Sequence, residues 1–97
     1  MIFKNQENWK WASEIISEHR NSDEYVFVEY LEPFCFYYNC DNKVIDFRNA
    51  HRYNNYNKVW IIYTHFFRVK LEYNFLKNFN NIFSVKKGNI RIFYYKK

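Results

Sequence analysis

Four polar or charged side chains could line a ligand-binding cleft: Glu29, Tyr30, His65 and Arg68. Glu29 and Tyr30 end one strand-like apolar segment, and His65 directly follows another. If the two strands run parallel, their carboxyl ends lie at the same edge of the sheet, which is where ligands bind in open α/β folds. The same pattern is also compatible with capped strand ends whose polar groups hydrogen-bond to one another.

A catalytic interpretation of this edge would use His65 as a general base and Glu29 as the carboxylate that orients it. No nucleophile and no metal cluster accompanies the pair in the sequence. We therefore expect no catalytic residue in this chain on its own. A small enzyme is the weakest of the alternative functions.

The composition argues against cofactor and metal sites. Loops that cradle phosphate need glycine, because backbone N–H groups must approach the anion closely, and the chain has one glycine. The three histidines, His19, His51 and His65, do not have the spacing of a metal-binding motif. Neither a cofactor nor a metal is expected.

The two cysteines, Cys35 and Cys40, are predicted to be free thiols. Four residues separate them, a spacing that matches no zinc motif, and no second pair completes one. If both lay on one short helix, they would be about 140° apart around its axis. That geometry is poor for a disulfide.

Hydrophobic periodicity divides the chain into alternating helices and strands. Helical spacing begins near Asn5 or Gln6 and continues to about Arg20, and the apolar run from Lys58 to Thr64 is the clearest strand. The other predicted elements are a strand over 24–30, a short helix from Pro33 to Tyr38 or Asn39, a brief strand over 44–47, a polar loop over 48–57, a helix over 69–79, and a hairpin with strands 82–85 and 90–95.

These elements predict one α/β domain over residues 1–97, because a chain of this length has the size of a single domain. The alternation of helices and strands favours a small Rossmann-like layered domain with a mostly parallel central sheet. The only glycine, Gly88, lies where a tight turn requires positive φ. A C-terminal antiparallel hairpin is therefore expected at the edge of the sheet.

Charge is divided unevenly along the chain, whose net charge is +5. Residues 1–47 hold four Lys/Arg and nine Asp/Glu, whereas residues 48–97 hold eleven Lys/Arg and a single acidic residue. A basic half attracts phosphate on nucleic acid or on lipid headgroups. The pairs Tyr37-Tyr38 and Tyr94-Tyr95 could stack on unpaired bases, although packing in or beside the core is the favoured interpretation. A small basic nucleic-acid-binding protein, as phages or plasmids encode, is thus one alternative.

No segment of the sequence has the ~20 apolar residues that a transmembrane helix needs. The longest uninterrupted apolar run is Val59–Tyr63, and the N-terminal residues lack the apolar stretch of a signal peptide. If the chain is complete, we expect it to stay in the cytoplasm, where it is made.

Three segments carry a resemblance to a known family. The first, Glu7–Ala12 with the strand that follows Ser22, is similar to an acidic-x-Trp-Arg-x-Ala helix followed by a Gly-Asp turn and a strand. The second, Phe36-Tyr37-Tyr38, resembles a helix end with two tyrosines. The third, Lys58–His65, resembles an Arg-x-Trp-hydrophobic-hydrophobic-x-Ser-His strand. All three are typical of the C-terminal soluble domain of polytopic, polyprenyl-phosphate-sugar-dependent membrane glycosyltransferases, related to protein mannosyltransferases and lipid A aminoarabinose transferases.

The resemblance implies a non-catalytic accessory domain. In that family the chemistry belongs to the membrane portion, and the soluble domain follows the last span on the extracytoplasmic side. The chain would then aid donor or acceptor binding or stabilise the membrane portion, with that portion or anionic lipid headgroups as its partner. Ser22 and Thr64 stand where the family usually has glycine and serine. A chain without membrane spans implies either a fragment of a larger transferase or a relative whose partner is encoded separately.

Overall fold

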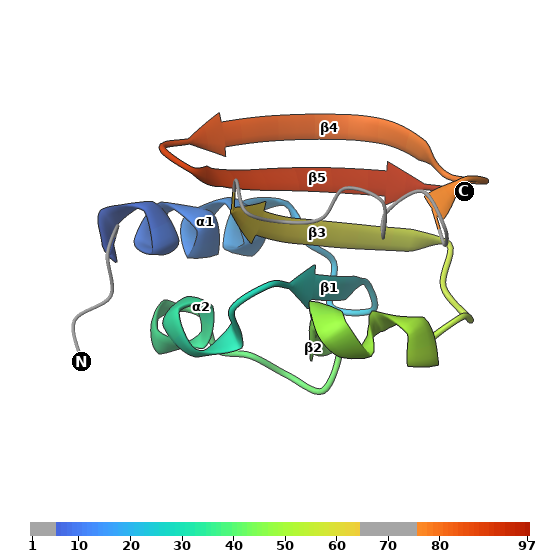
Figure 1. Cartoon of the computed structure of the whole chain (residues 1–97), viewed down its shortest axis with the longest axis horizontal. Helices are drawn as coiled ribbons and strands as arrows, with labels where there is room; N and C mark the ends of the chain where they lie inside the picture. Colours follow the sequence, from blue (N-terminus) through green and yellow to red (C-terminus); the bar gives the residue numbers. More distant parts are fainter. Residues whose placement is uncertain (1–5, 65–75) are drawn as a thin grey trace.

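The structure is a computed structural model that describes residues 6–64 and 76–97. These residues form a five-stranded sheet with the order β2-β1-β3-β5-β4, which runs from bottom to top in Figure 1. Two α-helices pack on one face of the sheet and a 3₁₀-helix packs on the other. In chain order the elements are α1 (Gln6–His19), β1 (Tyr25–Val28), α2 (Leu31–Tyr37), β2 (Val44–Asp46), η1 (Phe47–Arg52), β3 (Lys58–Thr64), β4 (Asn80–Lys87) and β5 (Ile90–Lys96).

The sheet is mixed, so the expectation of a mostly parallel, Rossmann-like sheet is wrong. β1 pairs in parallel with β2 and β3, but β5 is antiparallel to both of its neighbours, β3 and β4. β5 enters the sheet directly beside β3, with Trp60 opposite Tyr94. The apolar run of β3 arises because both faces of this central strand are covered. Burial on two faces does not specify the direction of the neighbouring strands.

The C-terminal hairpin consists of β4 and β5, with β4 at the edge of the sheet. Gly88 lies at its turn with a φ of 61°, a left-handed conformation that favours glycine. A Cβ atom at this position would also collide with the side-chain amide of Asn8. Glycine therefore allows both the tight turn and its close packing on the first turn of α1.

Each face of the sheet has its own apolar core. On the helical face, α1 and α2 contribute Trp9, Ala12, Ile16 and Phe34, which pack on alternate residues of the strands such as Trp60. On the opposite face, η1 contributes two buried residues that pack on the intervening strand residues, and the buried members are Phe27, Phe47, Ala50, Val59, Ile61, Tyr63 and Leu76. Successive side chains of a strand point to opposite faces of the sheet, so alternate residues belong to alternate cores.

The structure differs from the predicted loop over 48–57. Residues 47–52 form η1, because the Asp46 side chain accepts a hydrogen bond from the Arg48 backbone N–H at 2.9 Å and caps the helix. Burial of Phe47 and Ala50 on the sheet then fixes the helix in place. The predicted helix over 69–79 lies mostly outside the described residues.

Cys35 and Cys40 form a disulfide, so the prediction of two free thiols is wrong. α2 ends at Tyr37, and Cys40 therefore lies beyond the helix rather than on its far side. The two Cα atoms are 5.6 Å apart, within the usual range for a disulfide. The predicted separation of about 140° does not apply, because it requires both cysteines to lie on one helix.

Replacing both cysteines, as Cys35→Ser/Cys40→Ser, is expected to lower the free energy of unfolding by about 2 kcal/mol. The closed loop is short, with a sequence separation of 5, so its effect on the unfolded chain lies at the low end for disulfides. Urea denaturation measures the change. Reducing agent should shift the midpoint of the natural chain to that of the double variant and leave the variant unchanged, and an insensitive natural chain would contradict the disulfide.

Candidate functional site

The carboxyl ends of β1 and β3 meet at one edge of the sheet, because the two strands are parallel neighbours. Glu29 directly follows β1, and its Oε1 accepts hydrogen bonds from the backbone N–H of Thr64 at 2.8 Å and from its Oγ1 at 2.9 Å. The backbone N–H of Glu29 donates to the carbonyl of Ile62 at 2.9 Å. Glu29 thus caps the end of β3 at the predicted edge.

The predicted cleft is described only in part. Tyr30 follows Glu29, is 48% exposed and contacts the ring of Trp9 edge to face, with the ring centroids 6.5 Å apart. His65 and Arg68 lie outside the described residues. Glu29 and Tyr30 are therefore the two members of the predicted set whose surroundings are known, and the cleft as a whole stays a prediction.

The carboxylate of Glu24, which lies at the opposite end of β1, accepts three hydrogen bonds. Its Oε1 accepts hydrogen bonds from the Trp60 indole N–H at 2.9 Å and from the Asn21 backbone N–H at 3.0 Å. Its Oε2 accepts a hydrogen bond from the Tyr94 hydroxyl at 2.7 Å. Trp60 and Tyr94 are stacked, with centroids 4.4 Å apart. We call these four residues the Glu24 cluster.

The Glu24 carboxylate is buried yet remains ionised. Burial by itself would raise its pKa, but the hydrogen bonds from Tyr94, Trp60 and Asn21, together with the positive charge of Lys58, outweigh burial and lower the pKa below its ordinary 4.5. The pKa of Tyr94 is raised by burial and by the adjacent carboxylate. At neutral pH the cluster therefore holds a fixed charge and a protonated phenol, which anchor the strands but are unsuited to proton transfer.

Arg20 connects the Glu24 cluster to the segment after α2. Its side chain is only 2% exposed, and its Nε and Nη2 donate to the Glu24 backbone carbonyl at 2.9 and 2.7 Å. Nη1 and Nη2 also donate to the two oxygens of the Asp41 carboxylate, at 2.8 and 3.1 Å respectively. Nη1 also donates to the Tyr38 hydroxyl at 3.0 Å. This bidentate pair lowers the pKa of Asp41 and fixes the turn that precedes β2.

Sequence reasoning missed both Arg20 and Glu24. A signal for Glu24 was present, because buried Trp and Tyr side chains need a hydrogen-bond partner and an acidic residue lies directly before the strand that adjoins them. The tyrosine pairs also have structural roles. Tyr94 binds Glu24 on the helical face, whereas Tyr95 packs on the opposite core, so the two rings cannot form one stacking platform.

The described residues contain no group of three or more His, Cys, Asp or Glu side chains that could hold a metal ion. His19 ends α1 and contacts the ring of Phe83, and His51 is exposed on η1. Within residues 6–64 and 76–97, no helix has the length and hydropathy that a membrane crossing requires.

No family model, curated protein or solved structure matches the chain.

Proposed function

We propose that the chain is a non-catalytic accessory domain of a membrane glycosyltransferase, situated on the extracytoplasmic side and packed on the membrane-embedded portion. The Cys35–Cys40 disulfide is the observation that carries this proposal. Disulfides persist in oxidising compartments and are rare in the cytosol of mesophiles. A disulfide therefore fits the location that the family resemblance implies, and it disfavours a cytoplasmic protein.

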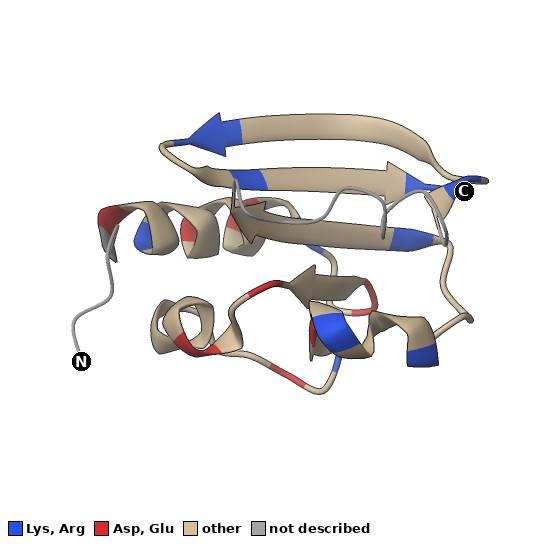
Figure 2. Ribbon diagram, viewed as in Figure 1, with Lys and Arg blue, Asp and Glu red and all other residues tan. Residues whose placement is uncertain are grey.

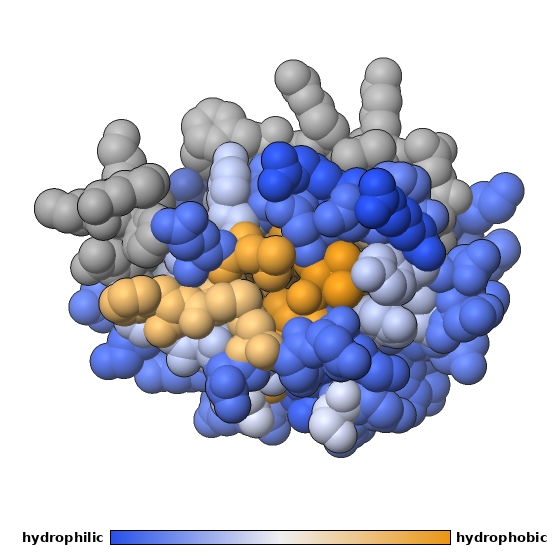
Figure 3. Space-filling view, turned by 90° about the horizontal axis from the view of Figure 1, so that it is seen from below, coloured by the Kyte–Doolittle hydropathy of each residue, from blue (hydrophilic) through white to orange (hydrophobic). Residues whose placement is uncertain are grey.

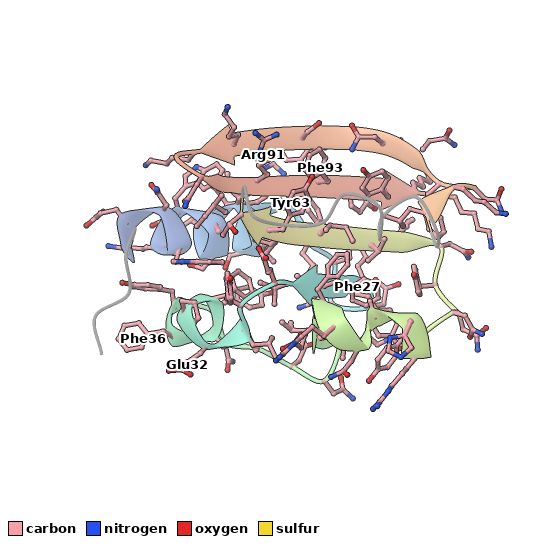
Figure 4. The ribbon with its side chains drawn as sticks, viewed as in Figure 1. Phe27, Glu32, Phe36, Tyr63, Arg91 and Phe93 are labelled. Carbon is pink, nitrogen blue, oxygen red and sulfur yellow. A yellow bond between two sulfur atoms is a disulfide. The ribbon has the colours of Figure 1, made fainter. Side chains whose placement is uncertain are left out.

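An apolar area on the surface fits a docking role. Figure 3 shows hydrophobic side chains gathered in the middle of the underside, bordered by hydrophilic ones. α2 and β2 lie on this side of the molecule, and α2 carries Phe36, which is 70% exposed. Figure 4 shows Phe36 and Glu32 pointing away from the sheet. An exposed apolar area with a polar border is typical of an interaction site. We refer to the apolar area around Phe36 as the α2 surface.

The distribution of charge supports a partner that contains phosphate. Figure 2 shows Lys and Arg at both ends of the β4–β5 hairpin and on η1, whereas the acidic residues lie on and around α1, α2 and β1. Lys86 and Lys87 are exposed beside the hairpin turn. Cations so placed suit anionic headgroups or a phosphorylated lipid donor near the membrane surface.

The first test is fractionation of cells of the source organism, followed by an immunoblot with an antibody against this chain. Cells are treated with a permeant maleimide before lysis, and the cysteines are labelled again after reduction. We expect a membrane-associated band much larger than 12.3 kDa, or a 12.3 kDa chain that co-purifies with a polytopic protein, with label added only after reduction. A soluble 12.3 kDa band whose thiols react before reduction would overturn the proposal.

The α2 surface can be tested with a matched pair of substitutions. When the separate 97-residue chain is added to membranes of the source organism, Phe36→Glu is expected to abolish its retention in the membrane fraction, because a charge would be buried at the interface. Ile82→Glu makes the same change on β4, where Ile82 is 58% exposed, and should leave retention unchanged. Circular dichroism of both purified variants controls for folding. Equal retention of the two variants would show that the α2 surface is not the contact.

A nucleic-acid-binding protein is the second candidate function. It is favoured by the basic C-terminal half of the chain and by the exposed lysines beside the hairpin turn. This alternative predicts an affinity for single-stranded DNA that falls steeply between about 50 and about 200 mM salt. Binding that is absent, or insensitive to salt, would remove it.

A further inference from the structure

A small hollow lies at the end of the sheet where β3 and β4 begin and β5 ends, near the C-terminus in Figure 1. Its volume is about 130 Å³, and it is lined by Tyr53, Asn54, Tyr56, Asn78, Phe79 and Lys97. The backbone N–H of Lys97 donates to the carbonyl of Asn57 at 2.8 Å, which ties the end of the chain to the loop before β3. We call this the C-terminal hollow.

Aromatic rings form the wall of the hollow and are held from behind. The centroid of Tyr56 lies 5.4 Å from that of Phe27 and 5.6 Å from that of Phe79. Tyr53 contacts Tyr25 with centroids 5.5 Å apart. Because Phe27 is fully buried in the core, the wall rests on a rigid support. Such rings present negative faces to the C–H groups of a ligand.

Polar groups complete the lining. The ammonium of Lys97 lies 5.8 Å from the centroid of Phe79, and none of the ion pairs found among the described residues involves Lys97. Asn54 and Asn78 contribute exposed amides, which both donate and accept hydrogen bonds. Burial raises the pKa of Tyr56 to about 12, so its hydroxyl stays protonated at neutral pH. The lining thus combines apolar faces, hydrogen-bonding groups and one cation.

Size and ring geometry restrict the ligand. The hollow is smaller than the roughly 300–1,000 Å³ of pockets that enclose drug-sized molecules, so it suits a single ring. The planes of Tyr56 and Phe79 are inclined by 36° to each other. The two rings contact each other and form one angled wall beside the hollow, which is not a continuous platform for successive bases of a nucleic-acid strand.

We propose that the C-terminal hollow binds one sugar ring that carries a phosphate group, with the ring against the aromatic wall, its hydroxyls on Asn54 and Asn78, and the phosphate on Lys97. This inference rests on the proposed function and specifies the part of the donor that the domain recognises. It assigns a binding role only, and no bond is made or broken in the hollow.

The test is a titration of the full 97-residue chain, labelled with ¹⁵N, with glucose 1-phosphate as the probe. Binding is measured by the chemical-shift changes of the protein. We expect saturable shifts at the lining residues with an affinity on the order of millimolar, weaker for both glucose and inorganic phosphate alone. Lys97→Gln should weaken binding roughly tenfold. Phe79→Leu should also weaken it, whereas Lys10→Gln, the same loss of an exposed charge on α1 at the opposite face of the sheet, should not. The spectrum of each variant establishes that it is folded.

Four outcomes would overturn the inference: no shifts at the hollow, equal binding of inorganic phosphate, equal binding by Lys97→Gln, or tighter binding of a dT oligonucleotide at the same residues. Each of these can occur whether or not the chain is found with a membrane partner. Failure of the hollow and failure of the accessory-domain proposal are therefore distinguishable.

Discussion

Replacing Glu24 by alanine is expected to lower the free energy of unfolding by about 3 kcal/mol. The substitution leaves the Trp60 indole N–H and the Tyr94 hydroxyl without their acceptor, and each unsatisfied buried donor costs about 1–3 kcal/mol. A domain of this size is stable by only about 5–15 kcal/mol. Urea denaturation, monitored by tryptophan fluorescence, should therefore give a much lower midpoint for Glu24→Ala than for the natural chain.

Three further variants make this prediction specific to the Glu24 cluster. Glu18→Ala removes an exposed carboxylate from α1 and should change stability by less than about 0.5 kcal/mol. Tyr94→Phe removes one hydrogen bond and should cost about 1 kcal/mol. In the double variant with Glu24→Ala, Tyr94→Phe should cost less than it does alone, because its partner is already absent. Equal stabilities of Glu24→Ala and Glu18→Ala would contradict the role assigned to the cluster.

The same carboxylate gives stability a dependence on pH with a definite sign. Its pKa is lower in the folded protein than the ordinary 4.5, because hydrogen bonds to the charged form outweigh burial. A lowered pKa stabilises the fold above the ordinary value and loses that contribution as the pH falls below 4.5 toward the folded pKa. The difference in stability between the natural chain and Glu24→Ala should therefore be full at pH 7 and shrink below 4.5.

Local structure could be predicted from the sequence wherever one physical requirement acts within a few residues. The spacing of Trp9, Ala12 and Ile16 indicated α1, and these three residues are indeed buried on one face of the helix. The run from Lys58 to Thr64 indicated β3 with its observed bounds. Gly88 indicated the hairpin turn, since only glycine adopts positive φ there without strain. Each of these signals is independent of the rest of the fold.

Properties that depend on distant pairing could not be predicted in the same way. The direction of β5 relative to β3 leaves no mark on the apolar pattern of either strand, so the sequence predicts a mostly parallel sheet with an antiparallel hairpin instead of the mixed sheet observed. The disulfide depends on the path of the chain after α2, which brings Cys40 back to Cys35, and the helical spacing of the two cysteines gives no information about that path.

The candidate site was predicted to a smaller extent than the fold. Parallel pairing of β1 and β3 did bring Glu29 to the end of β3, where it binds Thr64. The aromatic wall of the C-terminal hollow joins Tyr53 and Tyr56 to Phe79, which is more than twenty residues away in the chain. Such a site exists only after the sheet has formed, and no local pattern in the sequence encodes it.

Replacing Arg20 by methionine is expected to lower the free energy of unfolding by about 3 kcal/mol, although the apolar stem is largely kept. The guanidinium is almost fully buried and joins the Glu24 carbonyl to both oxygens of Asp41. Removing one partner of a buried pair costs about 3–5 kcal/mol. The lower end applies here because the Asp41 side chain is 43% exposed and can recover water.

Arg48→Met provides a matched control for this prediction. Arg48 also pairs with an aspartate at 2.8 Å, but its side chain is 87% exposed, and exposed pairs contribute about 0–1 kcal/mol. The two variants therefore remove the same chemical group at the same distance from a carboxylate. They differ in burial and in the hydrogen bonds that Arg20 also donates to Glu24 and Tyr38. Urea denaturation of both should give a large loss of stability for Arg20→Met and a small one for Arg48→Met. Equal losses would mean that burial does not set the strength of the Arg20 contacts, and the connection from α1 through Asp41 to β2 would then have to depend on apolar packing.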